Sequence, residues 1–393
     1  MPGKKRRPAG KLPFCHTVPL SLPAPACRIL EPGRCPTRTR TRRGQGKVMH
    51  ARRYKGPIID AHHHLWDLSM RRHPWISGRH VGVLGDVSHL QQDYLIDDLL
   101  ADMAGQGIVG SVHVEALWDR IHDPSEETLW LEGLARPAGI AGRYVGYVPL
   151  AAGGAAEMLE RQLAASPRLA GLRETIRWHP DPARSWTLRG LTEHAAWRQG
   201  LALLRAHGLV MELLMNPYQA EEVAALAAAL PDQVFIVDHC ASPLDRDAAG
   251  LERWRRGLRV LAARPNVAIK LSHPSAYSEG TETKALAAVV LPCLEAFGPG
   301  RAMFGSDYPM ARRSMSYAAI CDGLREILAP FSPSEQRAVF HDNAARYYRF
   351  PPAEPPRLSP PDGPRTVARA AGTRRRGSPR ERPGERPADP PPG

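Results

Sequence analysis

The sequence has few cysteines and no long apolar run, and each absence excludes a class of protein. Its six cysteines include no C-x-x-C pair and are too sparse for a disulfide framework, which indicates a reducing compartment. No window approaches the roughly 18–20 consecutive apolar residues of a membrane-spanning helix. Prolines interrupt the single candidate for a signal-peptide core, which follows the basic residues 4–7. We therefore expect a cytoplasmic protein with no membrane partner.

Positive charge is concentrated at the two ends of the chain. The 393 residues carry a formal net charge of +13, but residues 1–55 hold 15 Lys and Arg against one acid, and residues 351–393 hold nine Arg against five acids. Residues 56–350 are therefore mildly acidic. Both ends lack a helical or strand period, so we predict a basic N-terminal extension and a Pro/Arg-rich C-terminal tail, both disordered. A solvated extension is favoured over a nucleic-acid-binding arm, so we expect no nucleic-acid partner.

Between the tails, apolar runs rich in Val and Ile alternate with amphipathic windows. The predicted strands cover residues 57–61, 109–116, 144–150, 169–176, 209–215, 234–238, 267–271 and 302–305. The predicted helices cover residues 94–105, 126–135, 155–165, 193–206, 220–230, 252–263, 284–297, 317–328 and 333–348. Eight strand–helix repeats predict an α/β fold, a (β/α)8 TIM barrel over residues 56–350. A doubly wound sheet is the alternative, but no Gly-rich dinucleotide or phosphate-binding motif supports it.

Ionisable residues follow most of the predicted strands, where a barrel of this type places its active site. His62 and His64 share one face of an extended segment and together are suitable ligands for a zinc-like cation. The other candidates at strand ends are His113, Glu115, Arg173, Arg177, His239, Lys270 and Asp307. Taken singly, each has a structural alternative: a core histidine for His239 or a turn-forming aspartate for Asp307.

Four motifs in the right order resemble the amidohydrolase superfamily. They are Ile59–His64, Val237–Pro243, Ile269–Ser272 and Met303–Pro309, and the segment Asn343–Tyr348 is similar to the family's closing helix. The resemblance spans about residues 57–350. It is closest to the amidohydrolase-related branch that contains L-fuconolactonase-like sugar lactonases and 2-pyrone-4,6-dicarboxylate lactonase. What it implies is a distorted TIM barrel that hydrolyses lactones, sometimes with one divalent metal ion.

The same resemblance implies site residues by position. His62, His64, His239 and Asp307 match the family's metal-binding or catalytic positions, with Glu115 as an additional candidate ligand. Strand four has no lysine for carboxylation, so a binuclear centre is not expected. Strand five lacks the histidine of metal-dependent decarboxylase relatives, which favours the lactonase-like group. Whether one zinc-like ion is bound stays open.

We therefore predict a lactonase that acts on a small molecule, an acidic or sugar lactone. Asp307 would be the general base, and His239 with His62 and His64 would position water or polarise the carbonyl. Glu115 could instead be an acid/base group or a structural carboxylate, and Lys270 could stabilise an oxyanion or only reach solvent. Substrate-binding residues are predicted to be Arg173, Arg177, Lys270, Trp66, His113, Asn216, His273 and Tyr308.

Several alternatives stay open. Arg173 and Arg177 suit a substrate carboxylate, but an ion pair with Glu174 or Glu212 competes with that role. A metal-dependent decarboxylase of an aromatic or unsaturated acid is the alternative activity on the same fold. A nucleic-acid-associated protein that uses its basic tails is the alternative of another class. The sequence does not decide the oligomeric state, and a homo-oligomer is compatible with it.

Overall fold

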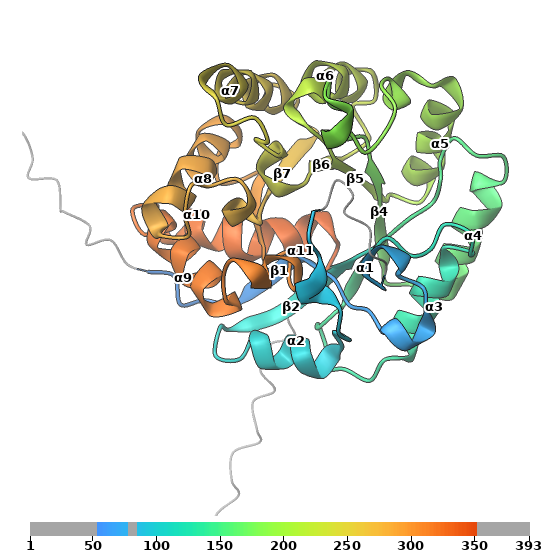
Figure 1. The fold of residues 1–393 in the computed structure, drawn as a ribbon, viewed down its shortest axis with the longest axis horizontal. Helices are drawn as coiled ribbons and strands as arrows, with labels where there is room; N and C mark the ends of the chain where they lie inside the picture. Colours follow the sequence, from blue (N-terminus) through green and yellow to red (C-terminus); the bar gives the residue numbers. More distant parts are fainter. Residues whose placement is uncertain (1–52, 78–84, 352–393) are drawn as a thin grey trace, which may run out of the picture. The chain divides into compact units, whose positions relative to one another are not determined.

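Eight parallel strands, hydrogen-bonded in sequence order, form the centre of the computed structural model, which describes residues 53–77 and 85–351 (Figure 1). Beyond the last strand, the backbone N–H of Asp307 donates to the carbonyl of His62 at 2.7 Å, and that of His64 donates to the carbonyl of Tyr308 at 2.8 Å. These bonds join the last strand to the first and close the barrel. The strands are β1 (Ile58–His63), β2 (Ile108–Val114), β3 (Arg143–Gly146), β4 (Leu169–Thr175), β5 (Val210–Leu214), β6 (Phe235–Val237), β7 (Val267–Ser272) and β8 (Ala302–Gly305).

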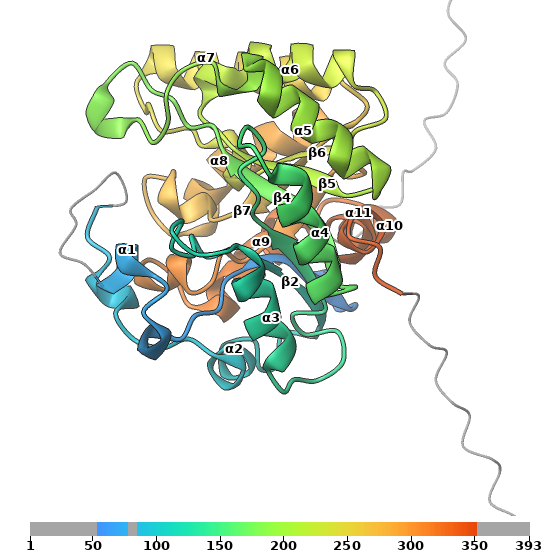
Figure 2. The ribbon, with the colours of Figure 1, turned by 90° about the vertical axis from the view of Figure 1, so that its right-hand side faces the viewer.

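Helices surround the strands, and Figure 2 shows α1 and the α10–α11 pair at opposite ends of the barrel. The helices are α1 (Pro74–Ser77), α2 (Ile96–Asp102), α3 (Ser125–Gly133), α4 (Ala155–Ala165), α5 (Ala195–Ala206), α6 (Ala220–Ala229), α7 (Ala248–Ala262), α8 (Thr283–Phe297), α9 (Tyr317–Leu328), α10 (Pro333–Arg337) and α11 (Asn343–Tyr347). No helix among these described residues is both long enough and apolar enough to cross a bilayer.

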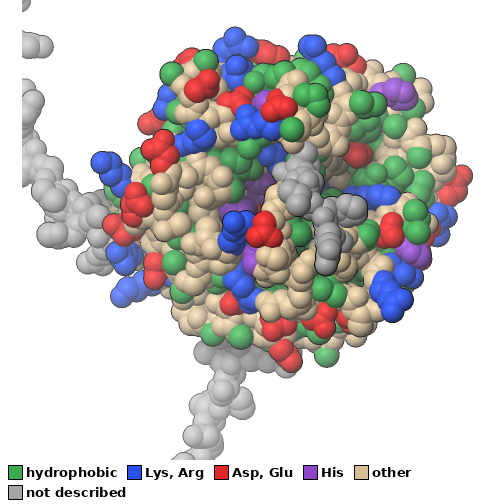
Figure 3. Space-filling view, viewed as in Figure 1, with side chains coloured by type: hydrophobic (Ala, Val, Ile, Leu, Met, Phe, Trp, Pro, Cys, Tyr) green, Lys and Arg blue, Asp and Glu red, His purple; other side chains and the backbone are tan. Residues whose placement is uncertain are grey.

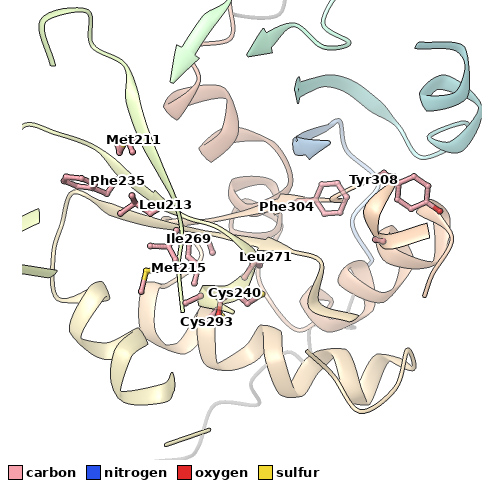
Figure 4. Close-up of a cluster of buried hydrophobic side chains, with 14 of the residues drawn as sticks. Met211, Leu213, Met215, Phe235, Cys240, Ile269, Leu271, Cys293, Phe304 and Tyr308 are labelled. Atoms are coloured by element: carbon pink, nitrogen blue, oxygen red, sulfur yellow. The ribbon is translucent and has the colours of Figure 1, made fainter. Parts of the chain in front are cut away.

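Two hydrophobic layers hold the barrel together. The outer layer lies between strands and helices, and Figure 4 shows part of it, with Leu213, Ile269 and Leu271 near Cys293 of α8. The inner layer fills the barrel and includes Val210 and Ile236, with Tyr348 packed against it. Each such large side chain that is fully buried stabilises the fold by about 1.5–3 kcal/mol.

The two-residue repeat of a strand explains why charged residues lie inside the barrel. Val210, Ile236 and Ala268 face the interior, so Glu212 and Lys270 two residues further along β5 and β7 do the same. Both charged side chains are fully buried. The interior therefore changes from apolar to charged on the way to the carboxyl ends of the strands.

The barrel confirms the predicted fold class, and the errors lie at element ends. Strand β3 stops at Gly146 instead of Leu150, because Pro149 has no N–H and Gln162 donates to the carbonyl of Tyr147. The predicted helix over residues 333–348 is interrupted by a π-helical turn, Ala338–Asp342. Helix α7 begins four residues before the predicted Glu252, because Asp247 caps it by accepting from the N–H of Gly250.

The folded part begins slightly before residue 56, the predicted boundary. Tyr54 stacks on Phe340 with ring centroids 4.9 Å apart, and its hydroxyl donates to the carbonyl of Pro57. The predicted disorder of residues 1–52 and 352–393 lies outside the described residues.

Candidate active site

The closure of the barrel brings together three of the predicted site residues. His62 and His64, at the end of β1, each place Nε2 close to Oδ1 of Asp307 after β8, at 3.4 and 3.2 Å. His62 and Asp307 are buried almost completely, and His64 is only slightly more exposed. The pairing of β1 with β2 shifts register between Asp60 and His63. Asp60 of β1 accepts hydrogen bonds from Ser306, the residue after β8, which holds the ends of these two strands together.

The donor atoms of this group suit a zinc-like ion. His64 donates from Nδ1 to the carbonyl of Val114 at 2.7 Å, which leaves the lone pair of Nε2 free in the neutral ring. Nδ1 of His62 lies 3.5 Å from Asp238, whose two carboxylate oxygens make no hydrogen bond with any described residue. Nδ1 of His62 also lies 3.2 Å from the ammonium group of Lys270, and Nε2 faces Asp307. Two imidazoles and the carboxylate of Asp307 are a ligand set that zinc accepts.

Two further histidines flank this group. His239, which follows β6, contacts the hydroxyl of Ser272 through Nδ1 at 2.8 Å, and with His62 and Asp238 it forms a second group that could hold a metal. His273, which follows β7, contacts the other oxygen of Asp307 through Nδ1 at 2.6 Å. Asp307 therefore contacts three histidines, and its two oxygens face different partners.

The electrostatics keep Asp307 ionised and lower the pKa of two neighbouring imidazoles. Burial acts to raise the pKa of Asp307, but His239 and the contacts with His273 and His64 outweigh it and hold the pKa well below its usual value. Burial, aided by the nearby Lys270, lowers the pKa of His62 well below its usual value. Burial also lowers the pKa of His239, against the opposing effect of Asp307. At neutral pH the site thus holds the ionised carboxylate of Asp307 beside the neutral imidazoles of His62 and His239.

The backbone at these positions is left-handed. The φ angles are +50° at His239, +46° at His273 and +57° at Asp307, and the three residues after His239 share this conformation. Non-glycine residues rarely adopt it, and such strained positions cluster at active sites. The strain supports a functional role for the ends of β6, β7 and β8.

These residues open into a cavity of about 310 Å³. Figure 3 shows histidine side chains in a hollow near the middle of this face. Predicted residues that line the cavity are His64, Arg173, Arg177, His239, His273 and Asp307. The rest of the lining is largely apolar: Trp75, Ala116, Leu117, Trp186, Leu214, Leu244, Ala276, Tyr277 and Met310.

Lys270 is not placed to bind a substrate, which corrects the prediction. Its ammonium group is fully buried below the cavity, 2.6 Å from Glu212, 3.6 Å from Asp238 and 3.2 Å from Nδ1 of His62. The hydroxyl of Tyr348 donates to the other oxygen of Glu212. We call Glu212, Asp238, Lys270 and Tyr348 the interior cluster. Its contacts with His62 make it a support for the site.

Glu115 is not in either group of candidate metal ligands among the described residues. Its carboxylate lies 3.0 Å from Nε of Arg173 and 3.0 Å from Arg120. Burial acts to raise the pKa of Glu115, but Arg120 and Arg173 outweigh it and lower that pKa. The structural alternative for Glu115 is therefore the better one. Arg173 forms an ion pair as the competing prediction held, but with Glu115 rather than Glu174 or Glu212.

Four predicted pocket residues lie behind the cavity wall. Trp66 is buried and donates to the carbonyl of Gln92. His113 is buried and contacts Glu127 on the outer side of the barrel. The hydroxyl of Tyr308 donates to the carbonyl of Met315. Asn216 supports the cavity indirectly, because its Oδ1 accepts from Nε of Arg177 at 3.2 Å.

Sequence reasoning missed the aromatic part of the lining. Trp75 comes from α1 in the loop after β1, and Trp186 and Tyr277 come from the loops after β4 and β7. No strand period marks such loop residues, so their position depends on the tertiary structure. Ser272, the partner of His239, could have been found, since it lies two residues after Lys270 on the same strand face.

Comparison with known proteins supports the family and the fold. The amidohydrolase family model matches residues 59–350. The chain is 34% identical over 294 residues to an uncharacterized protein of Sinorhizobium fredii, a match that covers 74% of this chain and 98% of the relative. It is 32% identical over 313 residues to the L-fucono-1,5-lactonase of Burkholderia multivorans, a match that covers 76% of this chain and 98% of the relative.

Solved structures give the same result. The crystal structure of an amidohydrolase from Burkholderia multivorans with bound HEPES has 29% sequence identity to this chain and a TM-score of 0.64. The match covers 75% of this chain and 100% of the chain in that structure. A second crystal form of that target contains zinc and has a TM-score of 0.63. Metal dependence is typical of amidohydrolases, and this chain has residues able to bind a metal. The chain belongs to the amidohydrolase family of (β/α)8-barrel enzymes.

Proposed function

We propose that the protein is a lactonase that opens a sugar or acidic lactone by attack of a base-activated water. The observation that carries this proposal is Asp307, an ionised carboxylate that contacts three histidines and lines the cavity. Its relatives include two Burkholderia proteins named L-fucono-1,5-lactonase, one at 32% and one at 27% identity. A cavity of about 310 Å³ suits a small-molecule substrate.

The proposed reaction uses the site residues as follows. Asp307 takes a proton from water, and the hydroxide formed attacks the lactone carbonyl. His239 and the His62/His64 pair position the water or polarise the carbonyl. When the tetrahedral intermediate collapses, the bond to the ring oxygen breaks and Asp307 returns the proton to that oxygen. The product is a hydroxy acid, and one water has been consumed.

His62, His64 and Asp307 would hold a single zinc-like ion. Such an ion supplies Lewis acidity and lowers the pKa of bound water. We propose zinc as the ion, because the nitrogen-rich ligand set suits it and a relative with 29% identity contains it.

The decarboxylase alternative lacks comparable support. Strand β5 carries no histidine, and its charged residue, Glu212, is buried against Lys270. The decarboxylases among the structural neighbours are 14–16% identical and share the fold.

A substrate screen tests the proposal. The purified chain is assayed against sugar and dicarboxylate lactones, with and without a chelator, and the products are identified as hydroxy acids or as carbon dioxide. We expect hydroxy acid from at least one lactone. Release of carbon dioxide from an aromatic acid, with no lactone opened, would favour the decarboxylase. Loss of turnover with chelator and recovery with zinc would support a bound ion.

A further inference from the structure

Arg177 is a buried cation without a counter-ion. Its side chain lines the cavity, and the residue is 9% exposed. Its Nε donates to Asn216, and its two terminal nitrogens make no hydrogen bond with any described residue. No described carboxylate lies within the 4.0 Å of an ion pair. Burial of an unpaired charge is costly, so such a group indicates a missing anion.

The other arginine among the described lining residues is paired. Arg173, four residues earlier on β4, is bound to Glu115. Arg120 is bound to the other oxygen of Glu115, and Arg184 and Arg253 share Asp245. Among these arginines, the lack of a described carboxylate partner is therefore specific to Arg177.

The surroundings hold Arg177 in place. The guanidinium carbon lies 5.1 Å from the centre of the Trp186 ring, and the backbone N–H of Trp186 donates to the backbone carbonyl of Arg177 at 2.8 Å. Asn216, which accepts from Nε, is itself fixed because its Nδ2 donates to the carbonyl of Trp178. Nε is thus occupied, and the planar end with the two terminal nitrogens remains for a ligand. A carboxylate fits this fork with two parallel hydrogen bonds.

The cavity lining does not neutralise Arg177. Asp307 is the one carboxylate among the described lining residues, and its oxygens already face three histidines. Apolar residues such as Leu117, Leu214 and Trp75 make up much of the remaining wall. A ligand with an apolar or ring-shaped body and one acidic group would match both features.

We propose that the substrate class is lactones that carry a carboxylate, which Arg177 binds while Asp307 acts on the ring carbonyl in the same cavity. The inference rests on the proposed lactonase function, which left neutral sugar lactones and acidic lactones open. It assigns Arg177, and not Arg173 or Lys270, as the residue that selects between them.

A binding experiment tests this without turnover. Tetrahydropyran-2-carboxylate and tetrahydropyran-2-methanol have the ring size of a lactone, cannot be hydrolysed, and differ in the charged group. Isothermal titration of the full chain in a Tris buffer of low ionic strength, free of sulfonates and carboxylates, compares the two. We expect the carboxylate to bind at least about tenfold more tightly, as a charge-assisted hydrogen bond contributes about 1.5–3 kcal/mol.

Variants identify the residue. Arg177→Met should reduce binding of the carboxylate to that of the alcohol. Arg189→Met is the matched control, because Arg189 belongs to the same loop, is exposed and lies over Trp178. The Arg189→Met variant should still bind the carboxylate more tightly than the alcohol. Asn216→Asp gives Arg177 an internal counter-ion and should also weaken the carboxylate selectively. Circular dichroism establishes that each variant is folded.

The outcomes separate this inference from the proposed function. Equal binding of the two probes by the wild type, or a preference that survives Arg177→Met in folded protein, overturns the inference. In that case the opening of neutral lactones would leave the lactonase proposal intact. Conversely, if the carboxylate preference depends on Arg177 but no lactone is hydrolysed, the carboxylate-binding role of Arg177 stands and the lactonase proposal fails.

Discussion

The interior of the barrel and its mouth are both rich in charged residues, but they differ in how completely those charges are paired. In the interior cluster, Lys270 has Glu212 and Asp238 within 4 Å, and Tyr348 completes the contacts of Glu212. At the mouth, the described residues provide no hydrogen-bond partner for the two terminal nitrogens of Arg177 or for Nε2 of His273. Paired charges support the structure, and unpaired ones remain available to a ligand.

The largest expected effect is on the interior cluster. Lys270→Met leaves Glu212 buried without its cation and leaves Asp238 with Arg173 at 3.9 Å. Breaking a buried ion pair by removing one partner costs about 3–5 kcal/mol, so the free energy of unfolding should fall by about that amount. Urea denaturation at pH 7 measures it. The double variant Lys270→Met/Glu212→Gln should recover part of the loss, because the uncompensated charge of Glu212 is gone.

Arg177→Met is the matched change at the mouth. It removes a buried cation that has no carboxylate partner, so the free energy of unfolding should stay the same or rise. If Lys270→Met and Arg177→Met lowered the free energy of unfolding equally, the proposed difference between paired interior charges and unpaired charges at the mouth would be wrong.

A smaller effect concerns a carboxylate outside both regions. Burial raises the pKa of Glu174 from 4.5 to about 7, and Trp197 is its hydrogen-bond donor. The folded state therefore binds more protons than the unfolded chain between about pH 4.5 and 7, so stability falls as pH rises through that window. Glu174→Gln has no ionisable group at this position, so the variant should not lose this stability as the pH rises. Its free energy of unfolding should exceed the wild type's by up to about 3 kcal/mol at pH 8, with little difference at pH 4.

Chemical denaturation at both pH values checks this expectation. Glu115→Gln provides the contrast, because two arginines lower the pKa of Glu115 and removal of its charge should destabilise the protein at pH 8. A pH-independent effect of Glu174→Gln would contradict the account.

The smallest expected effect lies at the rim. Asp245 accepts hydrogen bonds from His179, Tyr218, Arg184 and Arg253, and so ties the loops after β4, β5 and β6 to α7. Asp245→Asn weakens charge-assisted bonds that hold the loop bearing Trp186. We expect a loss of about 1 kcal/mol in stability and a rise of a few-fold in KM with little change in kcat. A large fall in kcat instead would place Asp245 in the reaction itself.

The sequence predicted the barrel well because its signals are local. Val-rich strands and amphipathic helices alternate, and the positions of His62, His64, His239 and Asp307 follow from strand ends. It predicted the partners of charged residues poorly. Lys270 was expected to face the substrate but is buried against Glu212 of β5, and Arg173, although it lines the cavity, is paired with Glu115 after β2. Such pairings depend on register across the sheet, which a single strand does not specify.

The cavity wall shows the same limit. Arg177 was found because it follows a strand, but its lack of a counter-ion depends on every neighbour in space. Trp75 and Trp186 lie in long loops, where no periodicity marks the residues that turn towards the site.

The most direct test of the central claim is the turnover of Asp307→Asn on the lactone that the wild type opens best. The substitution keeps the shape of the side chain but removes the base. The account predicts a loss of about 10²–10⁴-fold in kcat in protein that circular dichroism shows to be folded at the assay temperature. A folded Asp307→Asn protein that opens the lactone at the wild-type rate would contradict it.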